Sequence, residues 1–291
     1  MANLRLQTLL FIVSLMGFLS CQETTNHNSK SNLIDFPESL SLQAQEILPN
    51  ELGVIEVNAL DTLLFLSING GEHFFHVYNS NLEFLGEIGK KGFGPNEFQA
   101  PILVQSIEHD GDDTFIWLND KFRFTLTKVN LSQSLVKGKT IIDKQIEIEP
   151  DLALSQEVVF TDEKNIVGNM GIQALIPYRL RYYNLESGET KTTEDLPEIL
   201  EPQRIKRGDY YTLFYSFIAV HPNRKRIVSA LNYFNRMDIM DVDSSEPIKQ
   251  ITEGNGHSLF NAEKDIENGQ LVNLHNYYFD ISVTEEFILK L

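Results

Sequence analysis

Residues 103–118 read LVQSIEHDGDDTFIWL and contain the pattern from which the architecture follows. An apolar run, Leu103–Ile107, is followed by a turn rich in aspartate and glycine, His109–Thr114, and then by a second apolar run, Phe115–Leu118. Two short runs rich in aliphatic and aromatic residues, separated by such a turn, predict a pair of antiparallel strands. The stretch is therefore read as strand, tight turn and strand.

The same pattern of strand, turn and strand occurs five times along the chain. The repeats start near residues 54, 103, 158, 217 and 279, so their length grows from 49 to 62 residues. In most repeats a third apolar run and a more polar fourth run follow, as in Phe74–Tyr78 and Phe84–Ile88. Four antiparallel strands repeated every ~40–60 residues are typical of β-propeller blades. The sequence thus predicts an all-β propeller, with no sustained helical period.

Composition narrows the class of protein further. The chain has 291 residues, and its 24 Lys and Arg against 41 Asp and Glu give a formal net charge of −17. This charge repels the phosphate backbone of DNA and RNA, so we expect no nucleic-acid partner. A single cysteine excludes a disulfide framework and a cysteine-rich zinc module.

The N-terminus has the features of an export signal. Residues 9–19 are apolar but too few to span a bilayer, which requires about 20 residues. A small residue and then Cys21, the only cysteine, follow directly and resemble a bacterial lipobox, in which the cysteine is acylated. We therefore expect a lipoprotein signal peptide at 1–20, a flexible tether at 21–32 and a propeller domain at 33–291. The alternative is an ordinary signal peptide followed by an incidental cysteine.

Residues 85–101, LGEIGKKGFGPNEFQAP, form the most specific motif of the chain. They resemble the G-x-G-P-x-E-F…P motif of the TolB-like six-bladed β-propeller lipoproteins of diderm bacteria. The resemblance implies an exported, membrane-anchored propeller of unassigned biochemical role. The segment would link the first two blades, with Phe98 filling the gap between them and Glu97 accepting backbone N–H bonds. The residues of this inter-blade motif are Gly89, Gly92, Gly94, Pro95, Glu97, Phe98 and Pro101.

The number of repeats differs from that of the family. The chain ends two strands into the fifth repeat, which gives about four and a half blades, and the missing half of the fifth blade together with a sixth blade would require roughly 80 more residues. We expect either a truncated sequence or an open propeller, and we favour truncation because long bare sheet edges promote aggregation. Residues 40–47 alternate like an edge strand, which in a closed propeller would complete the last blade.

No local motif for catalysis or cofactor binding is present. H-x-x-x-H, H-E-x-x-H and G-x-S-x-G do not occur, and the glycine-rich segment lacks the order of a phosphate-binding loop. Asp110–Asp113 lacks the full pattern of a calcium loop and is typical of a tight turn. We therefore predict no metal ligand set and no cofactor. Candidate contacts for an anion or a glycan are Arg204, Lys206, Arg207, Tyr210 and Tyr211.

The leading hypothesis is a non-enzymatic propeller that binds a protein or a glycan at the cell envelope. The bilayer is a further expected partner through acylated Cys21, and we expect an outer-membrane lipoprotein that faces either the periplasm or the cell surface. One alternative is a metal-dependent lactonase or hydrolase of the six-bladed type, whose ligands come from distant inner strands, with Glu56 and Asn232 as candidates. The other is a truncated, non-functional remnant.

Overall fold

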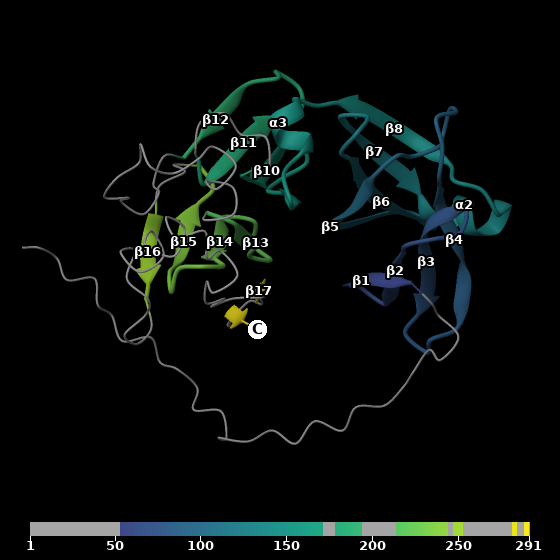
Figure 1. Cartoon of the computed structure of the whole chain (residues 1–291), viewed down its shortest axis with the longest axis horizontal. Helices are drawn as coiled ribbons and strands as arrows, with labels where there is room; N and C mark the ends of the chain where they lie inside the picture. Colours follow the sequence, from purple (N-terminus) through teal and green to yellow (C-terminus); the bar gives the residue numbers. More distant parts are fainter. Residues whose placement is uncertain are drawn as a thin grey trace, which may run out of the picture. The chain divides into compact units, whose positions relative to one another are not determined.

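The computed structural model describes residues 53–170, 178–193, 214–243, 247–252, 281–283 and 288–290. All of them belong to one compact unit, residues 38–291. The described residues form four four-stranded antiparallel sheets and one two-stranded sheet, each built from consecutive strands (Figure 1). Such a four-stranded sheet is the blade of a β-propeller. The all-β propeller predicted from the sequence is therefore confirmed.

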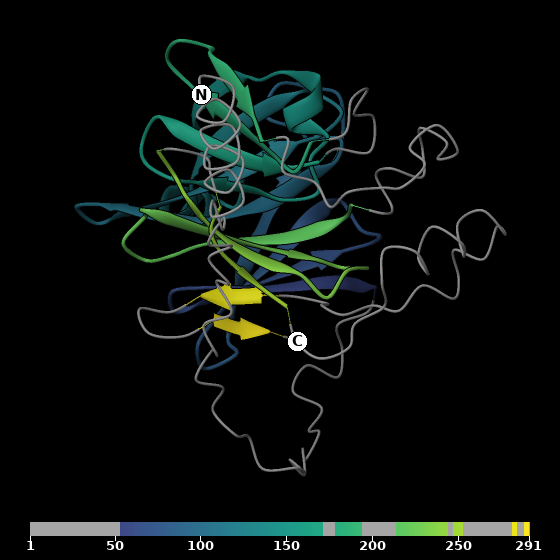
Figure 2. The same cartoon turned by 90° about the vertical axis from the view of Figure 1, so that its left-hand side faces the viewer.

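Each four-stranded sheet runs from an inner strand to an outer strand. The first contains β1 (Val54–Leu60), β2 (Leu63–Ile68), β3 (His73–Asn79) and β4 (Phe84–Lys90), and the second contains β5 (Pro101–Asp110), β6 (Asp113–Asp120), β7 (Thr125–Asn130) and β8 (Ile142–Glu147). The third contains β9 (Val158–Phe160), β10 (Asn165–Asn169), β11 (Leu180–Asn184) and β12 (Thr190–Thr192), and the fourth contains β13 (Ser216–Val220), β14 (Arg226–Leu231), β15 (Met237–Asp241) and β16 (Pro247–Ile251). The two-stranded sheet, beside β13, pairs β17 (Ile281–Val283) with β18 (Ile288–Lys290) (Figure 2).

Adjacent sheets pack face to face through apolar side chains. Their inner strands are neighbours in chain order, with β1 beside β5, β5 beside β9 and β9 beside β13. Between the first and second sheets, Phe75, Ile88, Ile116 and Leu118 are almost completely buried. Similar clusters join the later sheets in pairs. Where a sheet is covered on both faces, its strands must be apolar along their whole length, and β2 and β6 are accordingly mostly buried. The outer strands β8 and β16 are less buried and more polar.

Two short helices interrupt the strand pattern in the described residues. Helix α2 (Leu131–Lys137) follows β7, and the one-turn helix α3 (Pro150–Ala153) precedes β9. The side chain of Asn130 caps the start of α2 by accepting the N–H of Gln133, and Gly138 ends it in the left-handed conformation. The sequence did not predict either helix, because one or two turns are too short to show a 3.6-residue period.

A buried arginine joins the third sheet to the fourth. Arg179, just before β11, has a wholly buried side chain that forms an ion pair with Asp238 on β15. Its Nε donates to the hydroxyl of Ser229 at 3.1 Å, and its Nη2 donates to the carbonyl of Ser229 at 2.8 Å. Asp238 also accepts from Nε of Arg236 at 2.9 Å. The apolar packing of these two sheets thus contains an ionic contact with several partners.

Candidate functional site

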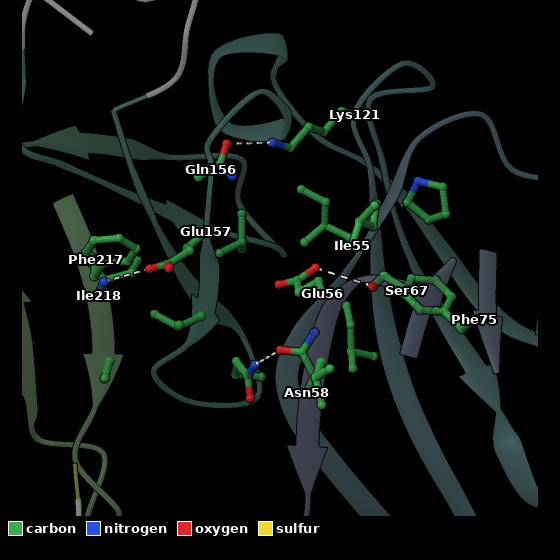
Figure 3. Close-up of a pocket in the computed structure, with 18 of the residues that line it drawn as sticks. Ile55, Glu56, Asn58, Ser67, Phe75, Lys121, Gln156, Glu157, Phe217 and Ile218 are labelled. Carbon is green, nitrogen blue, oxygen red and sulfur yellow. Dashed lines mark hydrogen bonds between the residues drawn. The ribbon is translucent and has the colours of Figure 1, made fainter. Parts of the chain in front are cut away.

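The inner strands of all five sheets line a central cavity of about 960 Å³ (Figure 3). This volume lies within the range of about 300–1,000 Å³ that is usual for small-molecule sites. Its lining contains aromatic as well as polar side chains, and the aromatic ones include Phe217 on β13 and the neighbouring Tyr215. The main polar lining residues are Glu56 and Asn58 on β1, Gln105 on β5, Lys121 after β6, and Gln156 and Glu157 before β9.

Asn58 brings a buried hydrogen-bond donor to the cavity. Glu56 and Asn58 are two residues apart on β1, so their side chains lie on the same side of the strand. The Oδ1 atom of Asn58 accepts a hydrogen bond from Nε2 of Gln105, which joins the first sheet to the second. Asn58 is only 7% exposed, and its Nδ2 has no hydrogen-bond partner among the described residues. An unpaired buried group costs about 1–3 kcal/mol, so this N–H₂ group is a candidate ligand contact.

Lys121 adds a cation to a cavity that also contains two carboxylates. Its Nζ donates to Oε1 of Gln156 at 3.4 Å, which joins the second sheet to the third. Burial lowers the pKa of Lys121, while the negative charges of Glu56 and Glu157 act in the opposite direction. Oε2 of Glu157 accepts the backbone N–H of Ile218 at 2.6 Å and so joins the third sheet to the fourth. Because the charges partly offset each other, the lining suits a polar ligand without a large net charge.

The predicted inter-blade motif connects β4 to β5. Glu97 lies at its centre, where one carboxylate oxygen accepts the N–H of Gly94 at 2.8 Å and the other pairs with Nζ of Lys90 at 3.0 Å. Those two contacts, in that order of importance, hold the pKa of Glu97 below its usual range. Gly92 has a φ of 151°, which L side chains rarely adopt, and a Cβ atom there would lie 2.1 Å from Oε2 of Glu97, so the position favours glycine. Phe98 is 2% exposed and belongs to the core between the first two sheets.

The other members of the motif have simpler positions. Gly89 has a positive φ of 73°, and its N–H donates to the hydroxyl of Thr140 at 3.0 Å. Pro95 is exposed in the loop. Pro101 is the first residue of β5 and pairs in register with Asp120, which is a strand position that tolerates proline.

The structure describes only some of the remaining candidate residues from the sequence. Cys21, Arg204, Lys206, Arg207, Tyr210 and Tyr211 lie outside the described residues, as do residues 40–47. Of the two candidates for distant metal ligands, Glu56 lines the cavity. Asn232 follows β14 rather than lying on an inner strand, and its backbone N–H donates to the carbonyl of Tyr215 at 2.8 Å.

Sequence reasoning missed most of the polar lining of the cavity. Asn58, Gln105, Lys121 and Glu157 were not singled out, although β1 reads VIEVNAL and carries two polar residues within an apolar run. Two polar residues two positions apart on an inner strand were the sequence signal that could have indicated a polar cavity. Their partners come from strands about 50 or 100 residues away, and no local pattern connects them.

The described part of the chain offers no cluster for a metal ion. No three His, Cys, Asp or Glu side chains there are grouped so that they could hold one. Gly111, with a φ of 60°, and Asp112 form the two-residue turn between β5 and β6, so the aspartates around them belong to a hairpin. Within the same described ranges, none of the helices has the length and apolar character that crossing a membrane requires.

The sheets and the cavity that they line define the class of protein, a β-propeller with a polar centre. The profile of the TolB-like 6-blade propeller-like family matches residues 55–291, and the chain belongs to this family. The resemblance seen in residues 85–101 is thereby confirmed. Among curated proteins, none matches the chain in sequence.

Solved structures resemble the chain to different degrees. A protein described as exported, from Bacteroides fragilis NCTC 9343, has a TM-score of 0.51 and 14% identity over 86% of this chain and 68% of that chain. A member of the DUF4221 family from Bacteroides vulgatus ATCC 8482 has a TM-score of 0.42 and 13% identity over 65% and 54%. Hydrazine synthase from Kuenenia stuttgartiensis has a TM-score of 0.40 and 12% identity over 73% and 52%, so the chain spans about half of that protein's length. At 14% identity, the likeness to the Bacteroides fragilis protein shows the fold alone.

Proposed function

We propose that this chain is a non-enzymatic, lipid-anchored protein of the cell envelope whose propeller binds a glycan in the central cavity. The observation that carries the proposal is the buried N–H₂ group of Asn58, which lines the cavity and has no hydrogen-bond partner among the described residues. A site that contains an unpaired buried donor favours a ligand that supplies the missing acceptor.

The chemistry of the lining favours a glycan over a protein segment or an ion. Sugar hydroxyl groups both donate and accept, and the cavity offers amides from Asn58, Gln105 and Gln156 together with the carboxylate of Glu56. The ring of Phe217 lines the same space and provides an apolar surface for the C–H groups of a sugar. A cavity of about 960 Å³ accommodates a sugar unit more readily than the broad, flat contact that is usual between proteins.

The envelope location rests on other observations. The lipobox-like Cys21 follows an apolar stretch of signal-peptide length, and the structurally similar Bacteroides fragilis protein is described as exported. Replacing Cys21 with Ala should move the full chain from the membrane fraction to the soluble fraction of its native host. Cys21→Ala that stays in the membrane fraction would refute the anchor, and the glycan proposal would then be judged by binding alone.

The glycan proposal is tested by comparing the wild-type chain with Asn58→Leu, which keeps a similar branched shape but has no amide. A printed glycan array and calorimetry with the array hits provide the affinities. We expect Asn58→Leu to bind about tenfold more weakly, as loss of one buried hydrogen bond implies. Lys164→Met is the matched control, because Lys164 is exposed and its ion pair with Glu186 lies outside the lining of the cavity.

Two outcomes would reject the glycan proposal. One is wild-type protein that binds no glycan on the array, and the other is Asn58→Leu that binds as tightly as the control while its thermal unfolding is unchanged. Elemental analysis of the purified chain separates this proposal from the metal-dependent hydrolase, since a stoichiometric divalent cation would favour the enzyme.

A further inference from the structure

Two loops lie at the same end of the central cavity. Pro101, the first residue of β5, is paired in register with Asp120, the last residue of β6. The loop that precedes β5 and the turn that follows β6 therefore emerge side by side. Gln99 in the first loop and Lys121 in the second both line the cavity. We call this pair of loops, residues 91–100 and 121–124, the rim.

The rim is held rigidly by one buried carboxylate. Asp120 is completely buried and accepts the backbone N–H groups of Gln99 at 2.8 Å and Ala100 at 3.1 Å from the first loop. From the second loop it accepts the N–H groups of Phe122 at 3.2 Å and Arg123 at 3.3 Å. A second tie runs between the loops, because Nη2 of Arg123 donates to the carbonyl of Gly94 at 3.0 Å. These contacts fix both loops without any ligand.

The rim nevertheless exposes two large apolar side chains. Phe93 is 86% exposed and Phe122 is 65% exposed, whereas Phe98 in the same first loop is 2% exposed. Phe93 lies between Gly92 and Gly94, the glycines that leave room for the carboxylate of Glu97. The sequence therefore builds an ordered loop in which one phenylalanine is buried and the other is presented to solvent. Two aromatic side chains exposed on loops that are tied to each other make the rim a candidate contact surface.

The basic residues in and next to the rim form ion pairs or hydrogen bonds within the protein, and this distinguishes the rim from a lipid-binding surface. Lys90, the last residue of β4 and directly before the first loop, pairs with Glu97. Lys91 donates to the carbonyl of Gly70, Lys121 to Gln156, and Arg123 to Gly94. A surface for anionic lipid requires cations that project toward the headgroups beside the apolar side chains. Continuity with the cavity through Gln99 and Lys121 favours a ligand that extends outward from it.

We propose that Phe93 and Phe122 stack on sugar rings that project from the cavity, so that the ligand is an oligosaccharide of several units. This inference rests on the proposed function, and it names the ligand class of the same site. One sugar occupies the cavity, and the next rings pack their C–H faces on the two exposed phenyl rings, whose π faces attract polarised C–H groups. Because the rim is already ordered, stacking costs little loop entropy.

The experiment compares affinities of the full chain for chitohexaose, cellohexaose and maltohexaose with those for the corresponding monosaccharides. Phe93→Ala and Phe122→Ala should each weaken hexasaccharide binding about tenfold and leave monosaccharide binding unchanged. Phe84→Ala is the matched control, because Phe84 is 53% exposed but lies on the outer strand β4. Thermal unfolding of each variant verifies that the fold is retained.

The outcomes separate the two proposals. Saccharide binding that depends on Asn58 but is unchanged by Phe93→Ala and Phe122→Ala would overturn the rim and leave the glycan cavity standing. Wild-type protein that binds neither hexasaccharides nor monosaccharides overturns both. If phosphatidylglycerol vesicles bind the Cys21→Ala chain and the further change Phe93→Ala abolishes that binding, the rim contacts lipid and the oligosaccharide inference fails.

Discussion

At the scale of single residues, the contacts that matter most come from charged side chains inside the protein. Arg179 and Asp238 form an ion pair with no exposed side-chain surface on either partner, and Asp120 orders two loops from a buried position. Charged residues are rarely buried without such partners, because transfer from water costs far more than one hydrogen bond returns. Their stabilising effect is therefore conditional on each partner being present.

Arg179→Met should destabilise the propeller strongly. The substitution keeps much of the side-chain volume but removes one of the two arginines that pair with Asp238 in the described part of the chain, which leaves Arg236. We expect the free energy of unfolding to fall by about 3 kcal/mol, as when one partner is removed from a buried ion pair. Urea denaturation measures the change, and Lys164→Met, which breaks an exposed pair, should leave the midpoint where it is. Equal midpoints for both variants would contradict the role given to Arg179.

Glu97 should make stability depend on pH. Its pKa is lowered in the folded state, so its charge stabilises the fold fully above the unfolded-state pKa, about 4.3, and this contribution disappears as the pH falls through the folded-state value. Glu97→Gln keeps an oxygen that can accept the N–H of Gly94 but removes the charge. The melting temperature of the variant should therefore be lower than that of the wild type at neutral pH, and the two should converge as the pH falls from about 4.3 through the lower folded-state pKa. A difference that stays constant with pH would show that charge is not the cause.

At the scale of elements, strands were predictable and the short helices were not. Apolar runs such as Phe115–Leu118 indicated strands because each sheet is covered on both faces, and the aspartate-rich turn before it indicated a hairpin. Helix α2 was missed because seven residues hold only two turns. The motif around Glu97 was partly predictable, since its glycines and prolines act locally. The cavity lining was not, because Asn58 and Gln105 meet only after two sheets have packed.

Asn130→Ala tests whether α2 depends on its cap. The side chain of Asn130 accepts the N–H of Gln133 at 2.9 Å and donates to Asp113 at 3.0 Å. Loss of the cap should lower the free energy of unfolding by about 1–2 kcal/mol, measured by chemical denaturation. Val136→Ala in the same helix is the control, because Val136 is 84% exposed and should change stability by less than about 0.5 kcal/mol. If the two variants unfolded at the same denaturant concentration, the cap would have no measurable effect.

At the scale of the whole molecule, the repeats determine how the sheets pack, and the net charge affects the stability of the fold. Repeats that start near residues 54, 103, 158 and 217 correspond to the four four-stranded sheets, because each unit buries its faces only against its neighbours. The chain carries a formal charge of −17, and the ion pairs in the described part of the chain leave this excess of carboxylates in place. Self-repulsion therefore opposes the compact state.

Added salt should stabilise the protein. Raising NaCl from about 0.02 M to about 0.5 M shortens the Debye length from about 20 Å to about 4 Å, so repulsion between distant carboxylates is screened. We expect the melting temperature to rise by several degrees, as recorded by circular dichroism across the series. A falling melting temperature would mean that screened ion pairs outweigh repulsion and would contradict this account.

The polar residues around the cavity also connect the sheets. Asn58 with Gln105 joins the first sheet to the second, Lys121 with Gln156 joins the second to the third, and Glu157 with the N–H of Ile218 joins the third to the fourth. A substitution that alters what the cavity recognises therefore also alters how two sheets are joined. Evolution of a new specificity at this centre would require paired changes on neighbouring sheets, whereas the rim residues Phe93 and Phe122 can vary one at a time.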